Sequence, residues 1–69
     1  MPSKPLLSVL IPAYDYANGV KRILDLVFGG LSAGLPLECV VSDDSQFSDV
    51  KDMVDEHPIS EFESFKFVR

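Results

Sequence analysis

The chain has 69 residues, 46% of them hydrophobic and 25% charged, so it forms at most one small globular domain. Eleven acidic and six basic residues give a net charge of −5, which argues against a nucleic-acid partner because phosphate binding needs clustered cations. No apolar run reaches the roughly 18 residues that a membrane span needs. The single Cys39, next to two valines, predicts a buried, inert thiol and fits a reducing, cytoplasmic compartment.

The first five residues, Met1 to Pro5, are polar and rich in proline and predict a leader that lacks a signal-peptide core. The apolar run from Leu6 to Ile11 does not alternate with polar residues, which is typical of a parallel strand covered on both faces. Pro12 removes a backbone donor and is expected to end this strand. Tyr14 and Asp15 follow at its carboxyl end, where open α/β sheets bind their ligands.

A helix is predicted over residues 18–29, with Asn18 as its N-cap and the pair Gly29-Gly30 at its end. Tyr16, just before it, is expected to lie over this helix. The apolar residues that repeat at helical spacing are Val20, Ile23, Leu24, Val27, Phe28 and Leu31.

A second buried strand is predicted from Leu37 to Ser42, and it leads directly to the acid pair Asp43-Asp44. A second helix is expected to start at Ser48 or Asp49, because acids in its first turn suit the positive end of the helix dipole. The acid pair Asp43-Asp44 is thus expected at the carboxyl end of the second strand, as Tyr14 and Asp15 are at the end of the first.

His57-Pro58 is expected to end the second helix, since the residue before a proline is pushed out of the helical region. We interpret His57 as a helix-end residue rather than as a ligand. Alternation from Glu63 to Val68 predicts a third strand. The order strand, helix, strand, helix, strand requires parallel pairing through right-handed crossovers. The predicted fold class is therefore α/β, a Rossmann-like β-α-β-α-β unit with a three-stranded parallel sheet and helices packed on it.

The strand ends carry the candidate chemistry. Asp43 and Asp44 repel each other unless a cation or a hydrogen-bond donor faces them. They could accept hydrogen bonds from a ribose or base, help to hold a metal, or form a solvated turn. Tyr14 either stacks on a flat ring or packs over the sheet edge. No glycine follows the first strand where a dinucleotide-binding or P-loop motif requires it, and the sequence shows no metal-ligand cluster or nucleophile–base pair.

Two segments together resemble family 2 glycosyltransferases. Residues 8–15, SVLIPAYD, are similar to the opening strand of that family, a hydrophobic run that ends Pro-Thr/Ala-Tyr-Asn. Residues 37–45, LECVVSDDS, are similar to its second strand, which ends Asp-Asp-x-Ser. The resemblance covers essentially the whole chain. It implies that residues 6–69 are the N-terminal nucleotide-sugar-binding part of a GT-A domain, a half of that fold.

The resemblance implies an enzyme that transfers a sugar from a nucleotide-diphosphate sugar to an acceptor hydroxyl, as in cell-envelope polysaccharide biosynthesis. It also implies that Pro12, Ala13 and Tyr14 line the pocket of the base. Asp44 would hydrogen-bond the nucleoside, and Asp43 would shape the turn. The sugar, the base and the acceptor stay open.

Asp15 stands where the family usually has Asn and adds a negative charge to the binding residues. Gln46 stands where the family has Ser, and Ser45 or Ser48 can substitute for that hydroxyl. In the family, an Asp-x-Asp motif that holds a divalent metal (Mg or Mn) and a general base lie beyond the third strand. The chain stops at Arg69, so the resemblance implies no catalytic or metal-binding residue here. We expect an inactive N-terminal fragment of a larger enzyme or a truncated gene product.

In the family's sheet the first strand is interior, with the second strand on one side and a later strand on the other. That later strand is not part of this sequence, so the run from Leu6 to Ile11 would present an unpaired edge. This predicts self-association through that strand or through the first helix. A cytoplasmic location is expected, with a peripheral position at the inner face of the membrane as an option for a full-length enzyme.

Two other interpretations of the function stay open. One is a non-catalytic binding or regulatory module, such as a receiver-like domain, which would need its acid pair after the first strand. The other is a structural fragment that only dimerises.

Overall fold

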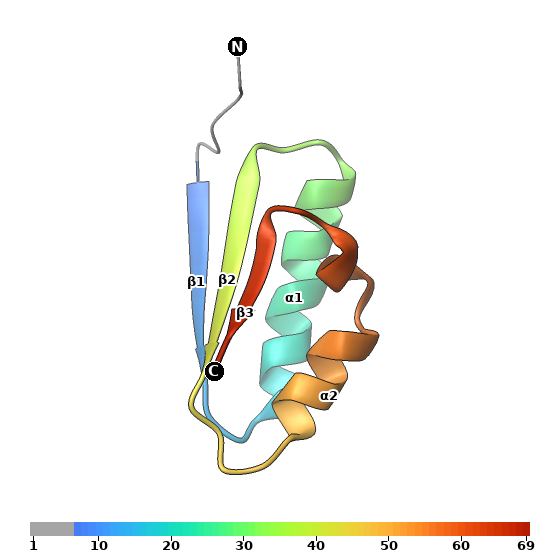
Figure 1. Ribbon diagram of the computed structural model, residues 1–69. Helices are drawn as coiled ribbons and strands as arrows, with labels where there is room; N and C mark the ends of the chain where they lie inside the picture. Colours follow the sequence, from blue (N-terminus) through green and yellow to red (C-terminus); the bar gives the residue numbers. More distant parts are fainter. Residues whose placement is uncertain (1–6) are drawn as a thin grey trace.

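The computed structural model describes residues 7–69 and shows one sheet beside two helices (Figure 1). The strand order is β1-β2-β3, and both pairings are parallel. The predicted α/β class with a three-stranded parallel sheet is confirmed. The predicted leader, residues 1–5, and Leu6 lie outside the described residues. The elements are β1 (Leu7–Ala13), α1 (Ala17–Ser32), β2 (Leu37–Asp43), α2 (Asp49–Glu56), the short 3-10 helix η1 (Pro58–Glu61) and β3 (Phe65–Val68).

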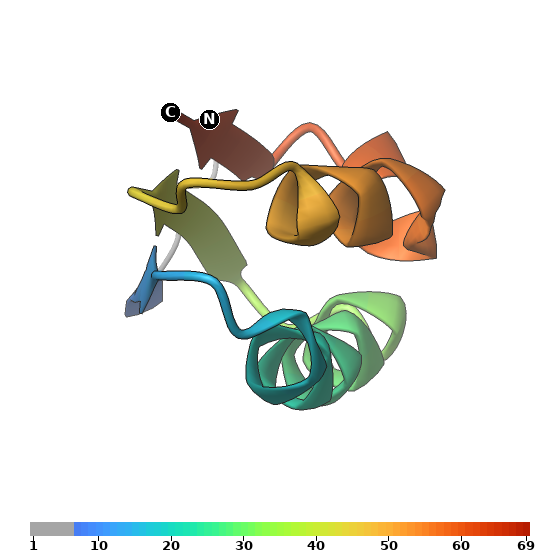
Figure 2. The ribbon, with the colours of Figure 1, turned by 90° about the horizontal axis from the view of Figure 1, so that it is seen from below.

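Both helices lie on the same face of the sheet, as the end-on view in Figure 2 shows. A strand order that advances in one direction through two right-handed crossovers produces this arrangement. No described helix covers the other face, where Leu10 is 68% exposed. The prediction that the first strand is covered on both faces is therefore wrong for the described residues. The buried core between helices and sheet consists of Ile11, Ala13, Val20, Leu24, Val27, Leu31, Cys39, Val41, Val50, Val54 and Ile59.

Pro12 lies inside β1 and does not end it, contrary to the prediction. The N–H of Leu7 donates to the Pro36 carbonyl at 3.4 Å. At the other end of the strand, the Ala13 carbonyl accepts from the N–H of Asp44 at 2.9 Å. The odd-numbered residues of β1 therefore bond to β2, and the backbone of Pro12 faces the free edge, because the polar groups alternate sides along a parallel strand. Its missing N–H removes no bond of the β1–β2 ladder.

The helix α1 starts earlier than predicted. It begins at Ala17 after Tyr16, and no side chain caps its first turn, so Asn18 is not the N-cap. The ring of Tyr16 lies so close to Gly19 that it leaves no room for a Cβ there. Tyr16 therefore lies over the first turn of α1, as expected from the sequence.

The helix α1 also ends later than predicted, because it continues through Gly29 and Gly30. The left-handed residue that ends it is Gly34, with a φ of 84°. The N–H of Leu35 donates to the Gly30 carbonyl and the N–H of Gly34 to the Leu31 carbonyl, both at 3.0 Å. These two bonds form a Schellman motif. The extra turn buries Leu31, which offsets the weak helix propensity of the two internal glycines.

The helix α2 begins after Ser48 and ends before His57, as predicted. The imidazole of His57 is buried, and its Nδ1 accepts the N–H of Ile59 at 3.1 Å. Its Nε2 lies 2.7 Å from Oδ1 of Asp25 on α1. Since Nδ1 is an acceptor, Nε2 carries the proton and donates it to the carboxylate. His57 thus joins α1 to η1, and both of its ring nitrogens are engaged.

The strand β3 is shorter than predicted, because it starts at Phe65 rather than Glu63. The chain before it forms η1, and the N–H of Phe65 still donates to the carbonyl of Phe62 at 3.1 Å. Phe65 and Phe67 pack against the core while Lys66 is exposed, which are the two faces that the alternation predicted.

The two glycines inside α1 provide a matched pair for a stability test. Nothing lies within 4 Å of a Cβ added to Gly29, whereas a Cβ on Gly30 would lie 2.8 Å from Cδ1 of Leu37. Gly29→Ala should raise the free energy of unfolding by about 1 kcal/mol through helix propensity. Gly30→Ala should gain less, because Leu37 must move. Urea denaturation of both variants measures the difference, and equal effects would contradict this packing.

The contact between His57 and Asp25 predicts a dependence on pH. The hydrogen bond from His57, and then that from Lys21, lowers the pKa of the Asp25 carboxyl below its ordinary value of 3.8. Because the folded pKa lies below the unfolded one, the carboxylate stabilises the fold above the ordinary value, and this contribution is lost as the pH falls through the folded pKa.

Asp25→Asn should therefore lower the free energy of unfolding near neutral pH, and its difference from wild type should shrink in acid. The effect should be modest, because half of the Asp25 side chain is exposed. Urea denaturation at a series of pH values measures it. Asp55→Asn, in the exposed pair with Lys51, is the control for a lost surface charge. A difference that stays constant into acid would argue against the assigned role of Asp25.

Candidate functional site

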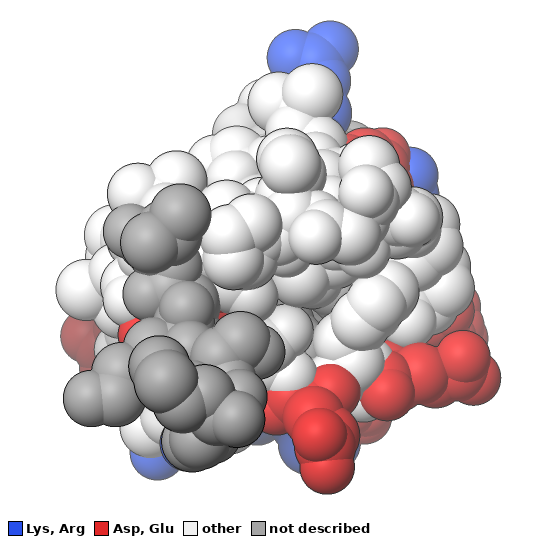
Figure 3. Space-filling model, turned by 90° about the horizontal axis from the view of Figure 1, so that it is seen from above, with Lys and Arg blue, Asp and Glu red and all other residues white. Residues whose placement is uncertain are grey.

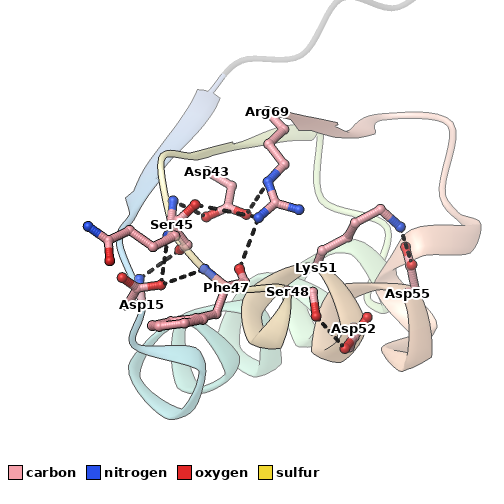
Figure 4. A network of polar contacts seen from close by, with 10 residues as sticks. Asp15, Asp43, Ser45, Phe47, Ser48, Lys51, Asp52, Asp55 and Arg69 are labelled. Atoms are coloured by element: carbon pink, nitrogen blue, oxygen red, sulfur yellow. Dashed lines mark hydrogen bonds and ion pairs between the residues drawn. The ribbon is translucent and has the colours of Figure 1, made fainter.

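The carboxyl ends of the three strands lie together at one end of the sheet (Figure 1). The pairing of β1 with β2 sets Ala13 opposite Asp43, so the chain leaves both strands at the same level. We call residues 14–16 and 44–48, which follow β1 and β2, the strand-end loops. Side chains from both loops and from the end of β3 point toward one another in Figure 4. The structure thus brings together the two motifs that the sequence singled out.

Asp15 connects the two strand-end loops both as a hydrogen-bond donor and as an acceptor. Its N–H donates to Oγ of Ser45 at 2.7 Å. Its Oδ1 accepts the N–H groups of Gln46 at 3.0 Å and of Phe47 at 3.3 Å. The backbone of Asp15 lies in the left-handed region, with a φ of 50°, which Asp tolerates better than most residues. The carboxylate that was expected to add charge beside a ligand is therefore bound by the protein's own backbone.

Asp43 has a fully buried side chain at the end of β2. Its Oδ1 accepts the N–H of Ser45 at 3.0 Å, which turns the chain away from the strand. Its Oδ2 has no hydrogen-bond partner among the described residues, and Nε of Arg69 lies 3.7 Å from it. A buried carboxylate is costly without a positive charge nearby, and the guanidinium supplies that charge.

Arg69 follows β3 directly and was not among the predicted site residues. Its Nη2 donates to the carbonyls of Phe47 at 3.0 Å and of Ser45 at 3.4 Å (Figure 4). The rule that led to Asp43, namely that residues after parallel strands meet at one edge, applies equally to Arg69. The sequence therefore contained a signal for this residue.

The loop after β2 has an acceptor for each of four consecutive N–H groups. That of Asp44 donates to the Ala13 carbonyl, and that of Ser45 to the Asp43 carboxylate. Those of Gln46 and Phe47 share the carboxylate of Asp15. Three of these donors are therefore held by carboxylate oxygens, which form stronger hydrogen bonds than neutral acceptors. A loop in which four consecutive N–H groups have acceptors has a defined conformation over those residues.

Two predicted ligand groups remain accessible. Tyr14 is 59% exposed, and its hydroxyl accepts a hydrogen bond from Nε2 of Gln46 at 3.2 Å. Asp44 is exposed, and its carboxylate takes part in none of the side-chain hydrogen bonds or ion pairs within residues 7–69. Pro12 is exposed beside the free edge of β1, whereas Ala13 is buried under the helices.

A groove of about 550 Å³ lies elsewhere, between α1 and α2. None of the predicted site residues lines it. His57 in its wall has both ring nitrogens engaged, so it offers no free nitrogen to a substrate or a metal. The lining residues are Lys21, Asp25, Phe28, Met53, Glu56, His57 and Pro58.

Within residues 7–69, no group of three or more His, Cys, Asp or Glu side chains could hold a metal ion. Of the three acids at the strand ends, Asp15 and Asp43 use Oδ1 for backbone amides. The divalent metal that the resemblance implies therefore has no ligand set in this part of the chain.

Cys39 is fully buried, and burial raises the pKa of its thiol, which agrees with the predicted inert cysteine. None of the described helices is long and apolar enough to cross a membrane.

No protein-family model, curated protein or solved structure matches this chain. The resemblance to family 2 glycosyltransferases therefore rests on the two strand-end motifs. The ligand roles assigned through it to Pro12, Ala13, Tyr14, Asp44 and Ser45 remain predictions.

Proposed function

We propose that the strand-end loops bind the nucleotide of a nucleotide-diphosphate sugar, as the nucleotide-binding part of a glycosyltransferase similar to family 2. The observation that carries the proposal is the 2.7 Å hydrogen bond from the Asp15 N–H to Oγ of Ser45, which joins the two motifs. Both motifs lie at the carboxyl ends of neighbouring parallel strands, where open α/β sheets bind ligands. The reaction that such a domain serves is the transfer of the sugar to an acceptor hydroxyl.

The accessible groups suit the nucleoside part of such a donor. Tyr14 presents an exposed ring on which a flat base can stack. Asp44 presents a carboxylate that can accept hydrogen bonds from ribose hydroxyls or from N–H groups of a base. The described residues offer no ligand set for a divalent metal, so the chemistry at the diphosphate is not assigned to them.

The distribution of charge favours a small ligand over a nucleic acid. Eleven acidic residues outnumber six basic ones in the sequence. On the face in Figure 3, which looks on the amino ends of the strands, Lys and Arg side chains are scattered and the acids gather along one side. Binding to a phosphate backbone would need the basic residues to form one patch.

A receiver-like module has less support from the geometry. Such a domain would need an acid pair after the first strand to hold a metal. Here β1 is followed by Asp15 alone, and its carboxylate is bound by two backbone amides. The pair Asp43-Asp44 follows β2 instead.

Titration with uridine and guanosine diphosphates tests the proposal. Binding should change the tyrosine fluorescence and shift the amide resonances of residues 14–16 and 44–48. Asp44→Asn should weaken binding about tenfold, because a charged hydrogen-bond acceptor is lost. Asp49→Asn, which removes a charge from the first turn of α2, is the matched control and should bind like wild type. The absence of any response at millimolar nucleotide would refute the proposal for this chain.

A second candidate, association between copies of this chain, is favoured by the edge of β1. No residue of Leu7–Ala13 is charged, and the outer edge of the strand has no partner among the described residues. Uncharged, exposed edge strands readily pair with another chain. The helix α1 is the second surface that was predicted for self-association. Its Leu26 is 79% exposed.

Two substitutions separate these surfaces. Leu10→Lys places a charge on the open side of β1, and Leu26→Lys places one on the outer side of α1. If copies associate through β1, Leu10→Lys should shift the species seen in sedimentation velocity toward the monomer, whereas Leu26→Lys should not. The opposite pattern would assign the contact to α1. Wild type that stays monomeric at high concentration would exclude this candidate.

A further inference from the structure

We propose that Asp15 is the positioning residue of the strand-end site. Its carboxylate holds the loop after β2 against the loop after β1, and in this way it fixes the relative positions of Tyr14 and Gln46. The inference rests on the proposed function for the identity of the ligand. The loop geometry that it describes can be measured without any ligand.

The loop after β2 depends on side-chain acceptors to keep its shape. Its backbone bonds directly to β1 only through the N–H of Asp44. The regular bonds of α2 resume with the N–H of Asp52, which donates to the Ser48 carbonyl at 2.8 Å. Between these points the amides of Gln46 and Phe47 have one acceptor, the Oδ1 of Asp15. Without that oxygen both amides lose their partner within the described residues.

The same residue joins two side chains that meet farther out. Tyr14 precedes Asp15 in the chain, and Gln46 donates its backbone N–H to the Asp15 carboxylate. The side chains of Tyr14 and Gln46 then meet in the 3.2 Å hydrogen bond between Nε2 and the phenolic oxygen. Both are exposed, so this outer contact alone cannot hold the loops together. The carboxylate provides the inner connection to Gln46 itself, beside the bond from the Asp15 N–H to Oγ of Ser45.

Two properties of Asp15 are needed, and Asn shares both. The backbone at this position lies in the left-handed region, which Asn and Asp adopt more readily than other residues with a Cβ. The side-chain oxygen must accept two N–H groups, which an amide oxygen can also do. Alanine lacks the acceptor and is strained at this φ. Asp15→Asn is therefore the conservative variant and Asp15→Ala the disruptive one.

The loop should stay attached to the domain in either variant. Arg69 donates to the carbonyls of Ser45 and Phe47 from the side of β3. The N–H of Ser45 remains bound to the Asp43 carboxylate. The removal of the Asp15 carboxylate should therefore loosen one segment of the loop and leave the sheet intact.

Amide hydrogen exchange followed by NMR provides the first test, on the free protein. In Asp15→Ala the amides of Gln46 and Phe47 should exchange about tenfold faster or more than in wild type, because their acceptor is gone. In Asp15→Asn they should exchange at close to the wild-type rate. The amide of Val41 in the buried strand β2 reports whether the fold is intact. Asp55→Ala, which removes an exposed carboxylate on α2, controls for the change in net charge.

Binding of uridine or guanosine diphosphate provides the second test. Asp15→Ala should weaken binding about tenfold relative to wild type, and Asp15→Asn should restore most of the affinity. Unchanged exchange of Gln46 and Phe47 in Asp15→Ala would overturn the inference, even if the nucleotide binds wild type. An Asp15→Asn variant that behaves like Asp15→Ala would also overturn it. A third outcome separates the two proposals. If the amides exchange faster in Asp15→Ala and at the wild-type rate in Asp15→Asn, the loop geometry is supported. If wild type at the same time binds no nucleotide, the proposed function is refuted.

Discussion

The strand-end site depends on the register in which β1 pairs with β2. In this register Ala13 lies opposite Asp43, so both strands end at the same level. The core specifies the register, because Ile11 and Val41 lie opposite each other and both are buried under the helices. A shift of β1 by one residue would turn Ile11 toward the open face of the sheet and leave Val41 without this partner in the core. It would also separate Asp15 from the loop that its carboxylate binds. The packing that forms the core therefore also places the two loops.

The sequence predicted the class of the fold and the order of its elements, because hydrophobic periodicity and connection length determine both. It did not predict local details that depend on tertiary contacts. Gly29 and Gly30 were expected to end α1, but the helix continues because Leu31 packs in the core and Gly34 provides the left-handed turn. Pro12 was expected to end β1, but a strand with a free edge accommodates a proline whose nitrogen faces that edge.

The open face of the sheet shows a different limit of sequence patterns. A run of apolar residues without alternation indicates two covered faces in a complete parallel sheet. Within residues 7–69 the helices cover one face only, and Leu10 is exposed on the other. The run itself cannot reveal this, because the side on which each helix packs follows from the strand order and from the hand of the crossovers.

The candidate site was predicted in outline. The rule that residues after parallel strands converge placed the two acid-containing loops together, and Arg69 obeys the same rule. The pattern could not show which acids bind the protein itself. Asp15 and Asp43 satisfy backbone amides, whereas Asp44 is exposed to solvent. This division depends on which carboxylate lies within hydrogen-bond distance of the loop amides and on the left-handed backbone of Asp15, which no spacing of residues encodes.

The burial of Cys39 has a consequence for the motions of the domain. It is the one cysteine of the chain and lies in β2, opposite Val9 of β1 and Phe65 of β3. Its sulfur is fully buried, so a thiol-modifying reagent can reach it only when the sheet parts from the helices or a neighbouring strand detaches. Because β2 is the central strand, such an opening involves most of the domain. The rate at which this thiol reacts therefore measures how often the domain opens, without an introduced label.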